Sequence, residues 1–110
     1  MKSWMGMILV LLLMMGTPAL VAQKGDATAG KAVYDKRCAS CHAAGGEGKE
    51  AIAKMFKVEM HPLGSKEVQA MSDGDLRKGI TEGKGKMAAV KGLSDKELAD
   101  VIAFVRSLKK

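Results

Sequence analysis

The stretch "KRCASCHAAG", residues 36–45, contains both cysteines of the chain, Cys38 and Cys41, with His42 directly after the second. Residues three and four positions apart lie on one face of a helix. If the stretch is helical, the two sulfur atoms and the imidazole therefore project from the same side of one turn. The segment would then offer two thiols and one metal-binding nitrogen to a single ligand.

C-x-x-C-H is the attachment motif of c-type haem, because a planar macrocycle with two vinyl groups can bond to both sulfurs while the imidazole reaches its iron. A structural zinc site needs four ligands, and only His61 remains to join the three. A thioredoxin-like redox pair needs a βαβ setting, and a disulfide across so small a loop stabilises little. We therefore expect one haem c per chain, with thioether bonds to Cys38 and Cys41 and His42 as proximal iron ligand, and keep zinc and thiol chemistry as alternatives.

Residues 1–22 show the three zones of a secretory signal peptide. Lys2 supplies the basic start, "MILVLLLMM" the apolar run and "GTPALVA" the small residues before a cleavage site expected after Ala22. An uncleaved anchor is the alternative, but a glycine and a proline cut the apolar run short of the ~20 residues that span a bilayer. We expect removal, which leaves residues 23–110 as one monohaem domain in the periplasm with no stable membrane insertion.

The expected domain has little material for a hydrophobic core. Its aromatic side chains are Tyr34, Phe56 and Phe104, and domains of this size usually gain stability from a disulfide, a metal or a cofactor. The net charge of +6 is dispersed along the chain, and no nucleic-acid-binding motif accompanies it. Composition thus favours a bound prosthetic group and argues against a nucleic-acid partner.

Helical signals predict an all-α domain of about four short helices. Asp26 is a good N-cap for a first helix that continues through the cysteines, and Ser72 caps a helix that ends near Gly83. Ser94 and Glu97 form a capping box at the start of the last helix. Residues 49–56 give the remaining helix. Apolar residues at spacings of three and four form a stripe on the last helix: Leu98, Val101, Ile102, Val105 and Leu108.

Three stretches, "AGKAVYDKRCASCHAA", "ITEGKGKMAAVKG" and "LSDKELADVIAFVRSLKK", make residues 23–110 resemble the class I c-type cytochromes, small soluble monohaem proteins of bacteria. The resemblance implies the cytochrome c fold, in which short helices wrap around one covalently bound haem and the first and last helices cross. Gly30, Tyr34 and Phe104 match the places at which that family packs the two helices closely.

Met87 is the expected distal iron ligand. A sulfur ligand must come from chain that has passed around the porphyrin edge, and Met87 lies far from His42, in a loop whose glycines let it bend. His61 is the rival, and would give a bis-histidine iron of lower potential. The family commonly has proline after this methionine, whereas this chain has Ala88, which leaves the loop less stiff.

With His42 and Met87 on the iron, no position is open for a substrate. The expected function is therefore a periplasmic one-electron carrier, not an enzyme, that acts as a monomer on redox partner proteins. Lys84, Lys86 and Lys91 would steer it toward acidic docking surfaces. The alternative is a haem sensor or peroxidase-like enzyme whose distal position is vacant or labile.

Overall fold

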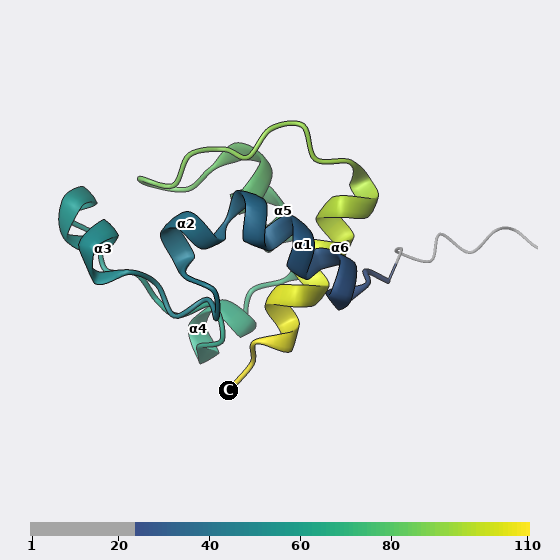
Figure 1. Cartoon of the computed structure of the whole chain (residues 1–110), viewed down its shortest axis with the longest axis horizontal. Coiled ribbons are helices and arrows are strands. Elements are labelled where there is room, and N and C mark those ends of the chain that lie inside the picture. Colours follow the sequence, from purple (N-terminus) through teal and green to yellow (C-terminus); the bar gives the residue numbers. More distant parts are fainter. Residues whose placement is uncertain (1–23) are drawn as a thin grey trace, which may run out of the picture.

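The computed structural model of the chain describes residues 24–110, which form helices joined by loops (Figure 1). The helices are α1 (Ala27–Arg37), α2 (Ala39–His42), α3 (Glu50–Phe56), α4 (Lys66–Gln69), α5 (Asp73–Glu82) and α6 (Asp95–Ser107). These residues contain no β-strand, only an isolated bridge between Lys84 and Met87. The all-α fold is confirmed. The signal peptide expected over residues 1–22 lies outside the described part.

Six helices stand where the sequence predicted about four. The first predicted helix divides at Cys38, whose φ of −124° and ψ of −36° leave the helical region. The single turn α4 was not predicted, because four residues are too few to show helical periodicity. Both differences concern single turns, so the order and type of the longer helices are as expected.

Helices α1 and α6 cross at close range. A Cβ atom on Gly30 would lie 1.9 Å from the carbonyl oxygen of Asp100, so only glycine allows the backbones to approach this far. One turn further along α1, the Tyr34 ring packs against the Phe104 ring with centroids 4.8 Å apart. The predicted crossing through Gly30, Tyr34 and Phe104 is confirmed.

Most of the core comes from α6. Its capping box forms as predicted, since Ser94 accepts the N–H of Glu97 and the Glu97 carboxylate accepts the N–H of Ser94. The spacing of three and four then directs one apolar face of the helix toward α1. The buried apolar side chains of the described part are Tyr34, Leu98, Val101, Ile102, Phe104 and Val105.

One carboxylate is buried in the same crossing. Asp100 accepts the backbone N–H of Asp26 at 2.8 Å and the ammonium of Lys96 at 2.8 Å. A buried carboxylate is costly unless both oxygens have partners, and here both do. Asp100 therefore ties the start of α1 to the middle of α6.

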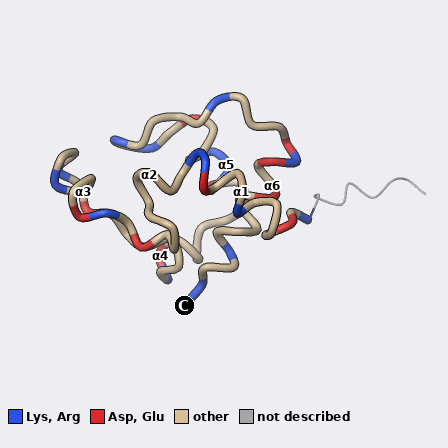
Figure 2. Tube along the Cα trace, in the orientation of Figure 1, with Lys and Arg blue, Asp and Glu red and all other residues tan. Residues whose placement is uncertain are grey.

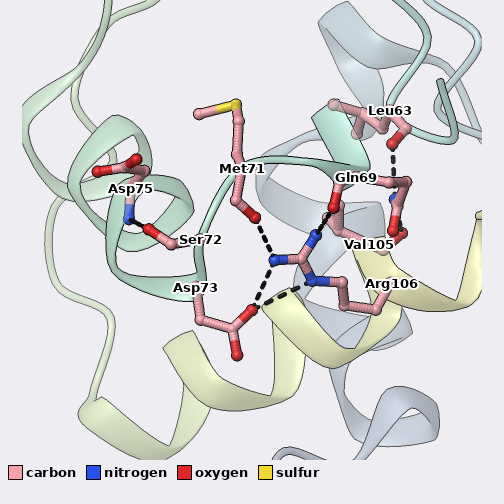
Figure 3. A network of polar contacts seen from close by, with 8 residues as sticks. All are labelled: Leu63, Gln69, Met71, Ser72, Asp73, Asp75, Val105 and Arg106. Atoms are coloured by element: carbon pink, nitrogen blue, oxygen red, sulfur yellow. Dashed lines mark hydrogen bonds and ion pairs between the residues drawn. The ribbon is translucent and has the colours of Figure 1, made fainter. Parts of the chain in front are cut away.

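A second polar network holds the segment before α5 against α6 (Figure 3). The Arg106 guanidinium donates to the carbonyl oxygens of Gln69 and Met71 and to the Asp73 carboxylate. The Gln69 amide in turn donates to the carbonyls of Leu63 and Val105 at 2.8 and 3.0 Å. These bonds tie α4, which contains no fully buried residue, to α6.

Helix α3 stands apart from the α1–α6 pair in Figure 1. It contains no buried residue, and the Met55 side chain is 64 % exposed. None of the helices between residues 24 and 110 has the length and hydrophobicity to cross a bilayer.

Candidate functional site

The cysteines and His42 lie on one tight turn between α1 and the loop that follows α2. The Cys38 N–H donates to the Tyr34 carbonyl at 2.8 Å, and the His42 N–H donates to the Cys38 carbonyl at 3.0 Å. The second bond is helical, so the spacing of Cys38, Cys41 and His42 places them around a single turn as predicted. Both thiols are free and partly buried.

The electrostatic state of this turn suits metal binding. Burial lowers the pKa of His42, which favours the neutral imidazole that a metal requires. Its Nδ1 atom is buried and has no hydrogen-bond partner among the described residues. Burial also raises the pKa of the Cys38 thiol, and nearby Arg37 partly opposes that effect. The turn thus presents a neutral imidazole with an unpaired nitrogen beside two thiols.

The backbone directly after His42 has an unusual conformation. Ala43 has φ of 65° and ψ of 167°, a region that L-residues rarely adopt. Its carbonyl accepts the Tyr34 hydroxyl at 2.5 Å and the Gly46 N–H at 3.2 Å. Burial raises the pKa of Tyr34 to about 12, so the hydroxyl remains a proton donor at neutral pH. Sequence reasoning assigned Tyr34 to the helix crossing alone and missed this second contact.

Met87 lies in the loop between α5 and α6, within a hydrogen-bonded turn. The N–H of Lys84 donates to the Met87 carbonyl at 3.0 Å, and the N–H of Met87 donates to the Lys84 carbonyl at 2.9 Å. Gly83 has φ of 81°, and a Cβ there would lie 2.5 Å from the Met87 carbonyl oxygen. The glycines expected to bend the loop therefore do so. The Met87 side chain is partly buried, whereas the rival ligand His61 is exposed.

The zinc alternative gains no support from the fold. Among residues 24–110, no three histidine, cysteine, aspartate or glutamate side chains gather in a way that could hold a metal ion. His61 does not complete a tetrahedral set with the cysteines.

Comparison with known families identifies the chain. The sequence model of the family Cytochrome c matches residues 27–109, nearly all of the described part. The chain belongs to the cytochrome c family. The cofactor of this cytochrome is therefore haem c, which is covalently bound. The protein belongs to the class of haem-based electron carriers.

Individual relatives agree with the family match. The chain is 33 % identical to cytochrome c-554(547) of Halothiobacillus neapolitanus over 91 residues, which cover 77 % of this chain and 99 % of the relative. It is 35 % identical to cytochrome c6 of Picosynechococcus sp. over 94 residues, covering 82 % and 77 % of the two chains. Among solved structures, the KustC0563 c-type cytochrome matches with a TM-score of 0.63 and 26 % identity, over 74 % of this chain and 98 % of that one.

The residues of this cytochrome fit haem c. Two free thiols and an imidazole with an unpaired buried nitrogen belong to one turn, which is the donor set that covalent attachment and iron ligation require. Cys38 also packs against the Tyr34, Val101 and Phe104 cluster, so the turn rests on the helix crossing. The crossing therefore provides a fixed base for the turn that contains Cys38, Cys41 and His42.

Proposed function

We propose that this cytochrome is an exported one-electron carrier with His42 and Met87 as the axial ligands of its iron. Cys38 and Cys41 hold the haem through thioether bonds. The observation that supports the proposal most strongly is the single turn that presents both thiols together with a neutral, partly buried imidazole. When bound, haem supplies a reversible one-electron exchange between Fe(III) and Fe(II).

Each of these residues has a distinct task. Thioether bonds at Cys38 and Cys41 would hold the haem next to α1. His42 would supply one iron ligand from the same turn, and Met87 would supply the other from a loop whose shape is held by its turn hydrogen bonds and by Gly83. With two protein ligands, no coordination position is left for a substrate, which supports a carrier and argues against an enzyme.

The proposal includes location and partners. Removal of residues 1–22 releases residues 23–110 into the periplasm as a monomer that meets redox partner proteins. Lys84 and Lys86 are exposed on either side of the turn that precedes Met87. They favour a partner with an acidic docking surface. Lys91 contributes less, since its ammonium lies 3.4 Å from the Thr81 carbonyl.

The substitution Met87→Ala tests the distal ligand. We expect loss of the far-red absorption band that iron–sulfur charge transfer gives the ferric protein, a lower reduction potential, and stoichiometric carbon monoxide binding by the ferrous variant. Met55→Ala is the matched control, because it removes an exposed methionine, and it should leave the spectrum unchanged.

Three other results would contradict the proposal. If the wild-type protein lacks the far-red band, and its ferrous form binds carbon monoxide only after His61→Ala, then His61 is the distal ligand. Rapid carbon monoxide binding by the ferrous wild type would favour the sensor or peroxidase-like function. An exported protein without colour would show that the chain binds no haem.

A further inference from the structure

We propose that Tyr34 is a positioning residue for the iron ligand His42, acting through a hydrogen bond from its hydroxyl to the backbone of Ala43. The inference rests on the proposed role of His42 as proximal ligand. It assigns to Tyr34 a task beyond packing at the α1–α6 crossing. Residues 38–43 are called the attachment turn below.

Tyr34 contacts the attachment turn at both ends. Its backbone carbonyl accepts the N–H of Cys38 at 2.8 Å, where the turn begins. Its hydroxyl donates to the carbonyl of Ala43 at 2.5 Å, where the turn ends. The cysteines and His42 lie between these two bonds. A single residue, through its backbone carbonyl and its hydroxyl, thus bonds to both ends of the segment proposed to carry the haem.

The Tyr34 ring is itself held in place. It is fully buried, with 0 % of its surface exposed, and it packs on Phe104 of α6. A phenylalanine ring would fill the same space, so the packing alone does not need a hydroxyl. Burying a hydroxyl is unfavourable unless it finds a partner, and the partner here is the carbonyl next to His42.

The backbone conformation of Ala43 must be stabilised by contacts with other residues. Its combination of φ 65° and ψ 167° is strained for any L-residue with a Cβ, and such strain persists only where the surroundings maintain it. Two donors meet its carbonyl, the Tyr34 hydroxyl and the Gly46 N–H. A neighbouring hydrogen bond, from the Gly48 N–H to the His42 carbonyl at 2.8 Å, requires the same backbone path through Ala43. Loss of the hydroxyl should let Ala43 relax and rotate the peptide that follows the ligand.

The test compares variants of the haem-loaded protein by two measurements, amide hydrogen exchange in residues 42–48 and the chemical shifts of the His42 ring protons in the ferrous state. Tyr34→Phe should speed exchange of the Gly46 and Gly48 amides by about tenfold, the effect of losing one buried hydrogen bond, and should move the His42 ring resonances. Adding Ala43→Gly should restore both toward wild-type values, because glycine adopts this backbone without strain.

One control separates positioning from general destabilisation. Ser107→Ala removes another hydroxyl-to-carbonyl bond, from Ser107 to Phe104 at 2.5 Å on α6, and should leave the His42 ring shifts unchanged. The inference is overturned if Tyr34→Phe matches wild type, if Ser107→Ala moves the same resonances equally, or if Ala43→Gly gives no rescue.

The outcome also separates this inference from the proposed function. If the wild-type ring protons show no shift from haem ligation, His42 is not the ligand and the proposed function fails. If they do and Tyr34→Phe leaves them unmoved, only the role of Tyr34 fails. Should Tyr34→Phe not accumulate with haem, the double variant with Ala43→Gly is expected to do so, and its failure would count against the inference.

Discussion

Gly30 sets the distance between α1 and α6. The carbonyl that a Cβ would meet belongs to the backbone of Asp100, which cannot move aside as a flexible side chain would. We predict that Gly30→Ala lowers the free energy of unfolding by about 3 kcal/mol, at the upper end of overpacking effects. Urea denaturation of the haem-loaded variants would measure the change.

Gly79 provides the matched control for that substitution. It lies within α5, and a Cβ there would meet no atom within 4 Å. Gly79→Ala should therefore raise stability by about 0.5–1 kcal/mol through helix propensity. Equal effects at the two positions would show that the close approach at Gly30 does not limit packing.

For single residues, the chemical role was easier to predict from the sequence than the backbone conformation. Cys38, Cys41 and His42 were predictable because their spacing by itself places them around one turn. The conformation of Ala43 was not, because alanine carries no preference for positive φ and the Ala43 carbonyl bonds to Tyr34, nine positions earlier. Met87 could be placed in its loop from the flanking glycines, and Gly85, with φ of 57°, lies inside the hydrogen-bonded turn between Lys84 and Met87.

At the scale of elements, the caps were the most reliable signal. Ser72 and Ser94 cap α5 and α6 as predicted. Each side-chain oxygen accepts a backbone N–H from the first turn of its own helix, so the contact depends only on neighbouring residues. The single turn α4 depends instead on contacts with distant parts of the chain. The Gln69 and Arg106 network that holds α4 bridges 36 and 37 positions, beyond the reach of local patterns.

The link between α1 and α6 through Asp100 predicts sensitivity to acid. Hydrogen bonds from the Asp26 N–H and from Lys96 hold the pKa of this carboxyl below its ordinary value of 3.8. A depressed pKa stabilises the folded state above the unfolded-state value, and that contribution is lost as the pH falls through the folded-state value.

We therefore expect Asp100→Asn to be less stable than wild type at pH 7, with the difference shrinking as the pH drops below 3.8. Urea unfolding at pH 7, 5 and 3 would measure it. Glu59→Gln, which removes an exposed carboxylate, should show no such convergence. A constant gap between wild type and Asp100→Asn across this range would disprove the linkage.

At the scale of the whole molecule, three exposed lysines of the loop between α5 and α6 lie near the proposed distal ligand in the sequence: Lys84, Lys86 and Lys91. Figure 2 shows basic positions at the tip of the loop between α5 and α6, away from the marked C-terminus. Exposed charges of this kind attract anions before contact, and salt screens the attraction. The direction of approach of an anionic partner is thus expected to follow this loop.

Replacing Lys84 and Lys86 together by glutamine should slow oxidation of the ferrous protein by an anionic iron hexacyanide complex by up to about tenfold at low ionic strength. The difference should vanish at high salt. Glutamine at Lys109 and Lys110 changes the net charge equally but at the other side of the molecule, so its effect should be much smaller. Stopped-flow rates at several salt concentrations would measure both, and equal effects of the two pairs would mean that only total charge matters.

The pairing of α1 with α6 also governs when the polypeptide can fold. Asp26 and Asp100, bonded across the crossing, are 74 positions apart, and most buried side chains belong to the later helix. During synthesis α1 has no partner until α6 has been made, so folding in the order of translation is impossible. If the chain is exported with its N-terminus first, its cysteines emerge before the helix that completes the core, and at that stage they are accessible to enzymes that attach the cofactor.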